Sequence, residues 1–265
     1  MSLKRSGALA LLSLVLLLAG LTTHDAQPAR SRMSAFPKLF LWAWEREERL
    51  EFINPREVGV AFLAETIYLS NDRIVERPRL QPLKVPNGTT LIAVVRIESE
   101  REAQAALTDR QRGLIVEALN RIARQQKVAA LQIDFDATMS ERDFYRKLLQ
   151  DTRRRLPESM PLSMTALASW CIFDDWISDL PVDEAVPMFF QMGLDEERVK
   201  NYFKAGGEIR PKLCRASVGV STDEMTASLL SLSSSGRIYI FNSQPWTEAS
   251  VHSVLERNRY EKLVP

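Results

Sequence analysis

The sequence has two histidines, two cysteines and ten glycines in 265 residues, and each scarcity narrows the chemistry open to it. His24 falls in the N-terminal leader and His252 in the last expected helix, so a histidine-based triad or zinc site has little support. No glycine-rich turn follows the first expected strand, which disfavours a dinucleotide-binding open sheet. The net charge is only +1, with no long basic run, so nothing indicates a nucleic-acid partner. We therefore expect no cofactor and no nucleic-acid partner.

The first 30 residues have the layout of a secretory signal peptide. Two basic residues precede an almost unbroken apolar run over residues 7–21, and a suitable cleavage site follows Ala26. The run is short for a membrane span, and an uncleaved anchor is the alternative. We expect an exported, periplasmic protein, with inner-membrane anchoring or secretion as alternatives, whose mature chain begins between Gln27 and Ser34. It would contact a membrane only through an uncleaved N-terminal segment.

Cys171 and Cys214 are the only cysteines, and an exported protein could pair them. Cys171 follows the end of one expected strand, whereas Cys214 precedes the start of another. Parallel strands would place the two thiols at opposite ends, beyond the Cα separation of about 7 Å that a disulfide allows. We therefore expect two unpaired buried thiols and not a bridge.

Strand-like and helix-like segments alternate after the leader, in a pattern typical of a parallel sheet covered by helices. Eight such units close naturally into a barrel. Asn71-Asp72 makes a turn that extends the second strand into a hairpin, whose prolines suit an edge position. We predict an α/β fold, a (β/α)8 TIM-type barrel of regular or irregular form, as one domain over residues 36–265. The expected strands span residues 38–44, 58–65, 91–97, 129–138, 162–170, 185–192, 216–221 and 237–242. The expected helices span residues 108–126, 140–155, 173–180, 195–203, 222–231 and 247–259.

The stretch AALQIDFDAT, at residues 129–138, alternates between apolar and polar side chains. Three apolar side chains lie on one face of this expected strand, and Gln132, Asp134 and Asp136 lie on the other. Carboxylates are rarely buried without a partner or a function. Two carboxylates two positions apart lie about 6–7 Å apart at the Cα atoms, which suits mutual tuning of their pKa values. We therefore take Asp134 and Asp136 as the centre of a site.

Polar side chains also end other expected strands, and the carboxyl ends of barrel strands carry the active sites of such folds. One carboxyl with a raised pKa can donate a proton while another stays ionised, which is the logic of glycoside hydrolysis. The expected ligand is a carbohydrate, because tryptophans at the mouth would stack against sugar faces. The expected catalytic residues are Asp134, Asp136 and Glu65. The expected substrate-binding residues are Trp44, Arg96, Glu98, Trp170, Gln191 and Asn242.

The same residues have structural interpretations. Asp134 and Arg96 could form a buried ion pair between adjacent strands. Asp136 could cap the helix that opens near Ser140, and Glu65 could support the hairpin. Two aspartates and a glutamate are thin support for a hard-cation site, so no metal is predicted.

Four sequence blocks carry a resemblance to a known family. They are QIDFDAT, LSMTALASWC, DLPVDEAVPMFFQMG and GVSTDE, and they occur in order between about Leu39 and Trp246. In these blocks the sequence resembles the bacterial family called domain of unknown function 3142. That family has no established activity to carry over. It is similar to TIM-barrel glycosidases, so the resemblance implies a barrel of that kind.

A looser comparison is with chitinase-type glycosidases, whose fourth strand ends in D-x-x-D-x-D-x-E with the glutamate as proton donor. Aligning Asp134 and Asp136 with the second and third aspartates places Leu131 at the first aspartate and Thr138 at the glutamate. The expected proton donor is therefore missing.

Two readings follow from the missing donor. Another carboxylate, such as Glu65, Glu98 or Asp183, takes the role, or the barrel binds a glycan without cleaving it. The sequence thus favours an exported glycoside-hydrolase-like enzyme and leaves open whether it is catalytic. The alternative is a non-catalytic glycan-binding or accessory envelope protein.

Overall fold

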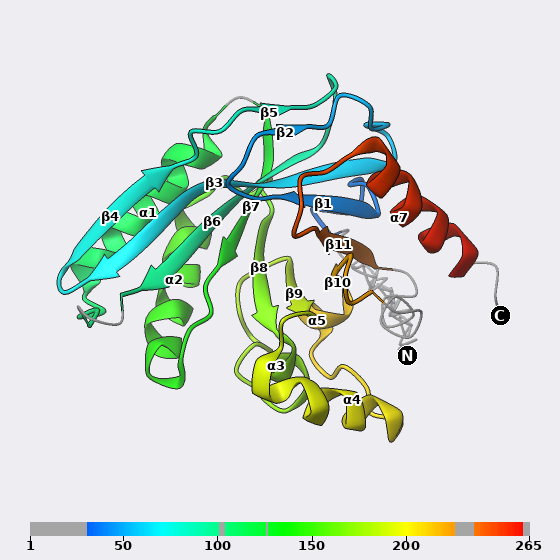
Figure 1. Ribbon diagram of the computed structural model, residues 1–265. Coiled ribbons are helices and arrows are strands. Elements are labelled where there is room, and N and C mark those ends of the chain that lie inside the picture. Colours follow the sequence, from blue (N-terminus) through cyan, green and yellow to red (C-terminus); the bar gives the residue numbers. More distant parts are fainter. Residues whose placement is uncertain (1–30, 101–103, 126, 226–235, 262–265) are drawn as a thin grey trace, which may run out of the picture. The chain divides into compact units, whose positions relative to one another are not determined.

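The computed structural model describes residues 31–100, 104–125, 127–225 and 236–261. Eight parallel strands close into a barrel, because β1 pairs with β3 on one side and with β11 on the other (Figure 1). The predicted TIM-type α/β barrel is therefore confirmed. Its strands, in order around the barrel, are β1 (Leu39–Ala43), β3 (Val58–Ser70), β6 (Leu91–Ser99), β7 (Val128–Asp134), β8 (Leu162–Leu167), β9 (Glu184–Met188), β10 (Ser217–Ser221) and β11 (Arg237–Phe241).

Side chains along each strand alternate between the barrel lumen and the layer beneath the helices. Phe40, Trp42, Ile92 and Tyr239 belong to the lumen cluster and are almost fully buried. The intervening residues, such as Leu41 on β1, join a larger apolar cluster that includes the inner faces of the helices. Because both faces are covered, the strand middles are nearly continuous apolar runs.

The barrel is irregular in its first two connections, which contain no helix in the fully described residues 44–90. β1 leads into the short β2 (Glu48–Arg49). β3 continues into an antiparallel hairpin with β4 (Arg73–Pro78), and β5 (Leu83–Lys84) then pairs with β2. The predicted hairpin extension after the second strand is thus confirmed (Figure 1).

Helices follow the later strands. Thr108 caps α1 in a reciprocal capping box with Gln111, as its position in the sequence indicates. The described helices are α1 (Asp109–Ala123), η1 (Met139–Glu141), α2 (Arg142–Arg155), α3 (Ala168–Ile172), η2 (Gly193–Asp195), α4 (Glu196–Lys204), α5 (Lys212–Arg215) and α7 (Glu248–Glu261). The helix predicted over residues 222–231 falls mostly on residues 226–235, which lie outside the described part of the chain, as do residues 1–30.

The fifth strand ends earlier than the sequence predicts, and this allows the two cysteines to pair. β8 stops at Leu167, and the next five residues form α3, so Cys171 lies on a helix and not beyond a strand end. α3 and α5 both contact β9, and Cys171 forms a disulfide with Cys214 of α5 across a Cα separation of 5.9 Å. The prediction of two unpaired thiols is wrong, because it placed the cysteines at opposite ends of parallel strands.

No helix within the described ranges is both long and apolar enough to span a lipid bilayer.

Candidate functional site at the mouth of the barrel

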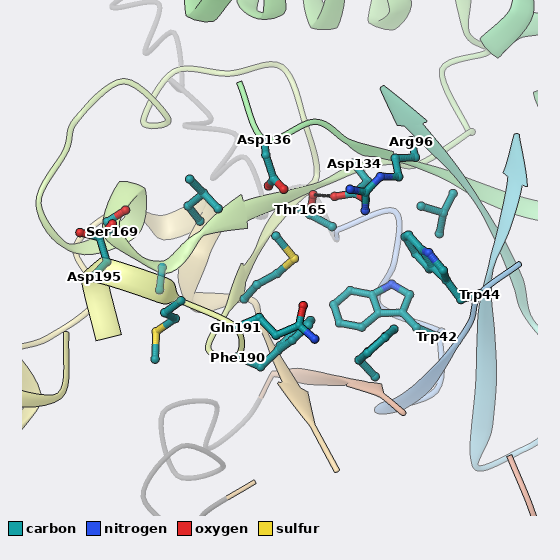
Figure 2. A pocket seen from close by; sticks show the side chains of 16 residues that line it. Trp42, Trp44, Arg96, Asp134, Asp136, Thr165, Ser169, Phe190, Gln191 and Asp195 are labelled. Carbon is teal, nitrogen blue, oxygen red and sulfur yellow. Dashed lines mark hydrogen bonds and ion pairs between the residues drawn. The ribbon is translucent and has the colours of Figure 1, made fainter. Parts of the chain in front are cut away.

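A cavity of about 290 Å³ opens at the carboxyl ends of the barrel strands. On several strands the lining residues alternate in sequence, because every second side chain points toward the barrel axis, and loop residues beyond β8 and β9 complete the walls. Trp42 and Trp44 come from the end of β1, whereas Asp134 and Asp136 come from the end of β7. Figure 2 shows the carboxylates and Arg96 on one side of the cavity, facing the two indole rings.

Asp134 is the inner carboxylate and is almost fully buried. Thr165 Oγ1 donates a hydrogen bond to its Oδ1 over 2.7 Å, and Arg96 Nη1 lies 3.4 Å from its Oδ2. Burial raises the pKa of Asp134, although the charge of Arg96 and the hydrogen bond from Thr165 both act in the opposite direction. The buried ion pair foreseen between adjacent strands is therefore present, since Arg96 of β6 and Asp134 of β7 are register partners.

Asp136 lies beyond the end of β7 and is exposed at the cavity surface. Desolvation by the surrounding walls, and next the negative charge of Asp134, raise its pKa to about 6. It does not cap the following helix, because Thr138 and Glu141 form the capping box of η1. Asp136 is thus a carboxyl that opens onto the cavity and exchanges a proton near neutral pH.

Arg96 joins the acidic wall to the aromatic wall. Besides Asp134, its guanidinium donates a hydrogen bond to Glu98, and its Cζ lies 5.7 Å from the centre of the Trp44 ring. The positive charge of Arg96 lowers the pKa values of Asp134 and Asp136 against the effect of burial. Removing it would therefore shift both carboxyls further toward their neutral forms.

A second, more polar cavity of about 660 Å³ adjoins the first. Arg96, Asp134 and Asp136 line both cavities, so the carboxylate pair stands where the two meet. Glu98 and Ser140 belong to the second cavity only. Together the cavities offer space on both sides of Asp136.

Hydrogen bonds and close packing fix the position of the Trp42 ring in the aromatic wall. The Trp42 indole nitrogen donates a hydrogen bond to Gln132 Oε1 over 2.9 Å, and Gln132 Nε2 donates to Ser163 Oγ over 3.0 Å. Gly219 of β10 provides space for the indole, since a Cβ there would lie 2.8 Å from Trp42. Beside it, the rings of Phe190 and Phe241 are stacked with centroids 5.4 Å apart.

Six of the predicted site residues lie on these cavities. Trp44 and Gln191 line the first, Glu98 lines the second, and Arg96 and Asp134 line both, as does Asp136. Gln191 has a left-handed backbone, with φ of 51°, and its backbone N–H donates to the Glu224 carboxylate. A non-glycine residue in this conformation is strained, and such strain is concentrated at functional sites.

Glu65 is the clearest correction, because it faces away from the mouth. The pairing of β3 with β6 shifts register between Leu63 and Glu65, and this irregularity reverses the alternation of inward and outward side chains. Glu65 therefore points toward α1, where Arg121 Nη2 lies 3.3 Å from its carboxylate. Desolvation there raises the pKa of Glu65, but the residue supports the hairpin and lines neither cavity.

Three further predicted residues lie away from the cavities. Trp170 is buried on α3, where its ring packs edge-to-face on Trp176 at 4.9 Å, because β8 ends before it. Asn242 is buried and accepts a hydrogen bond from Thr222, so it joins two loops. Asp183 precedes β9, at the opposite end of the barrel from the mouth, and is paired with Arg32.

Sequence reasoning missed residues that line the first cavity. Thr165 lies near the end of β8, Phe190 follows β9, and Phe241 ends β11. Like Trp44, each lies close to the carboxyl end of its strand and faces the barrel axis. A search of the inward-facing positions at every strand end would therefore have found them. Asp195 was assigned only to a helix start, and no sequence signal marks it as part of the site.

Within the described residues, no group of three or more histidine, cysteine, aspartate or glutamate side chains could hold a metal ion.

Comparison with known proteins gives little to build on. No family model matches the sequence, and no curated protein matches it. A solved structure that overlaps it is the chitinase domain of the spore coat protein CotE from Clostridium difficile, with 12% identity and a TM-score of 0.39. The overlap covers 79% of this chain and 65% of that domain, so this chain spans under two thirds of its length. We therefore base the function on the cavities and side chains of this chain.

Proposed function

We propose that the mouth of the barrel binds a glycan and hydrolyses it, with Asp136 as the proton donor. The observation that carries this proposal is the Asp136 carboxyl, with a pKa of about 6, which opens onto a cavity faced by Trp42 and Trp44. A flat aromatic wall suits the apolar face of a sugar ring, and an acid of this pKa suits protonation of a glycosidic oxygen. The resemblance to domain of unknown function 3142 and the signal-peptide-like leader favour an exported enzyme acting on an extracytoplasmic glycan.

The two aspartates would have different roles. Asp136 would act in its protonated form, which predominates below its pKa of about 6, and would give its proton to the leaving oxygen. Asp134, with Thr165 and Arg96 as partners, would hold negative charge beneath the sugar and stabilise the positive charge that develops at the anomeric carbon. The negative charge of Asp134 also raises the pKa of Asp136 and so favours the protonated form that a proton donor needs.

The test is turnover of cell-wall and storage polysaccharides and of aryl glycosides by the wild type and by Asp136→Asn. The variant should lose about 10²–10⁴-fold in kcat on unactivated glycans. Asp72→Asn, on the exposed hairpin turn, is the matched control and should retain full activity. Unchanged activity in Asp136→Asn would remove Asp136 from the role of proton donor.

A second candidate function is glycan binding without cleavage, and one observation favours it. Thr138 stands where a chitinase-type donor would be, and its hydroxyl donates to Glu141 over 2.7 Å within a capping box. Threonine cannot replace that acid. Glycan affinity without any product after long incubation, lost in Trp44→Ala, would support this function over hydrolysis.

A further inference from the structure

Asp195 is a carboxylate whose position in the fold gives it no structural partner. It ends η2, directly before α4, where an aspartate would ordinarily accept a hydrogen bond from a backbone N–H of the helix. Its side chain makes no such capping bond. Within the described residues its carboxylate also has no ion pair and no other hydrogen bond.

The same side chain lines the first cavity. Asp195 and Ser169 lie together on one side of the cavity, away from Asp136 and Asp134, and the Gln191 amide lies at the lower side (Figure 2). The carboxylate thus comes from the loop after β9, whereas the aspartate pair comes from the end of β7. A ligand in this cavity would have a carboxyl group on each of two sides.

We propose that Asp195 is the second catalytic carboxylate, the general base that activates water for hydrolysis with inversion. This inference rests on the proposed hydrolase function. Inverting glycosidases need an acid on one side of the sugar and a base on the other, separated far enough to leave room for a water molecule. Asp134 is a poor base for this step, because its oxygens are already engaged by Thr165 and Arg96.

The step balances without any further reactant. Asp136 gives its proton to the glycosidic oxygen as the bond from that oxygen to the anomeric carbon breaks. Asp195 takes a proton from water as the water oxygen bonds to the anomeric carbon. One water is consumed for each bond cleaved, and solvent returns the proton from Asp195 to Asp136.

The experiment compares the wild type, Asp195→Asn and Glu197→Gln on the glycan that the wild type hydrolyses, with and without sodium azide. Glu197 lies two residues further along on an exposed part of α4, so its variant is the matched control and should keep wild-type kinetics. Asp195→Asn should lose about 10²–10⁴-fold in kcat with little change in KM. Azide should restore turnover and give a glycosyl azide, because the azide anion attacks without losing a proton.

The Asp136→Asn variant gives the complementary result. An activated dinitrophenyl glycoside needs no protonation of its leaving group, so this variant should keep turnover on it, whereas azide should not rescue it on the natural glycan. The unfolding temperature of Asp195→Asn should match the wild type, since no partner of the carboxylate is lost. The first product of the wild-type enzyme, followed by NMR, should have inverted configuration.

Several outcomes would overturn the role of Asp195. They are wild-type activity in Asp195→Asn, loss of activity that azide does not restore, and retained configuration in the product. In each case the wild type still hydrolyses glycan, so the proposed function stands. A wild type that hydrolyses none of the glycans tested refutes the proposed function itself, and the base role falls with it.

Discussion

At the scale of single residues, the surroundings of the Asp136 carboxyl make its charged form unfavourable. Its pKa is about 6 in the folded protein against an ordinary value of 3.8, so the folded state binds its proton more tightly than the unfolded chain does. Stability therefore falls as the pH rises from about 4 to 6 and stays lower above that range. The charged form is the destabilising one.

This sign leads to a prediction for Asp136→Asn. The amide cannot ionise, so we expect the variant to unfold at a higher temperature than the wild type at pH 8, with little difference at pH 4. Thermal unfolding followed by circular dichroism at the two pH values measures this. An Asp136→Asn variant that is equally destabilised at both pH values would show that the carboxyl has a structural partner instead.

Arg96 gives a second prediction at this scale. Its positive charge lowers the pKa of Asp136, so Arg96→Gln should move that pKa above 6 and shift the alkaline limit of any activity upward with it. Titration of carboxyl carbons by NMR in protein labelled at aspartate measures the midpoint directly. Arg110→Gln, which removes an exposed partner of Asp72, is the control. A midpoint that falls or stays fixed would contradict the arrangement described.

The sequence pattern predicted some of the residues that line the cavity, but it could not reveal those whose orientation depends on irregular backbone. Alternation predicted that Asp134 and Asp136 lie on one face, and both line the cavity, because the pairing of β7 with β6 is regular from Ala130 to Asp134. The same reasoning failed for Glu65, because a register shift at Leu63 reverses the alternation and leaves no trace in the side-chain pattern. Asp195 ends η2 in the connection after β9, where strand alternation no longer applies, so no local pattern could have revealed it.

At the scale of elements, the cysteine bridge fastens the segment that carries part of the cavity wall. It joins α3 to α5 across 43 residues, and this loop includes β9 and the residues that follow it, Phe190 and Gln191 among them. Sequence could not reveal the bridge, because it depends on β8 ending at Leu167. An apolar run ending in a tryptophan does not distinguish a long strand from a strand followed by a short helix.

We predict that the bridge stabilises the fold by about 2–4 kcal/mol, as is typical for a loop of this length. Urea unfolding with and without reductant measures the effect, and reduction should lower the midpoint. The double variant Cys171→Ala with Cys214→Ala should unfold at a lower midpoint that reductant no longer changes. An unchanged midpoint on reduction in the wild type would contradict the prediction.

Two glycines allow a matched comparison of element packing. At Gly219 of β10 a methyl group would lie 2.8 Å from the Trp42 ring and 3.3 Å from the Pro187 carbonyl oxygen. Gly219→Ala should therefore cost about 1–3 kcal/mol and displace the indole, and it should weaken the proposed glycan binding. Gly113 lies on the exposed side of α1 with open space around it, so Gly113→Ala should stabilise by about 0.5–1 kcal/mol. Chemical unfolding measures the stability of both variants, and tryptophan fluorescence reports on the indole. If both substitutions changed the unfolding free energy in the same direction, the packing explanation would be wrong.

At the scale of the whole molecule, the barrel was predictable because eight apolar strand-like segments, most of them followed by a helix-like segment, admit few topologies. The missing helices after β1 and β3 did not disturb that count, since β2, β5 and the hairpin take their place in the sequence. The polar side chains inside the lumen were harder to predict from the sequence. Glu184 and Arg237 form a buried ion pair at the amino ends of the strands, and Tyr239 donates to the same carboxylate. This polar layer closes the barrel at the end opposite the mouth.

Met33 lies at the same end of the barrel, and its contacts limit where a cleaved leader could end. Its side chain is fully buried in the lumen cluster, and its carbonyl oxygen accepts a hydrogen bond of 3.0 Å from Arg237 Nη1. The preceding Arg32 pairs with Asp183 at 2.9 Å. A mature chain that began at Ser34 would lose all three contacts and open the lumen to water.

If the leader is cleaved, we predict that the cut leaves Arg32 and Met33 in place, so that the mature chain begins at Arg32 or at an earlier residue of the expected range from Gln27 to Ser34. Mass spectrometry of the exported protein measures the new N-terminus. Proteins produced from Gln27 and from Ser34 should differ in unfolding free energy by about 2–5 kcal/mol, the usual cost of removing a buried methionine side chain. Met33→Ala in the longer form should account for most of that difference, because the cavity it leaves is apolar and enclosed. Equal stability of the two forms, or a mature chain that starts at Ser34, would mean that Met33 does not close the barrel.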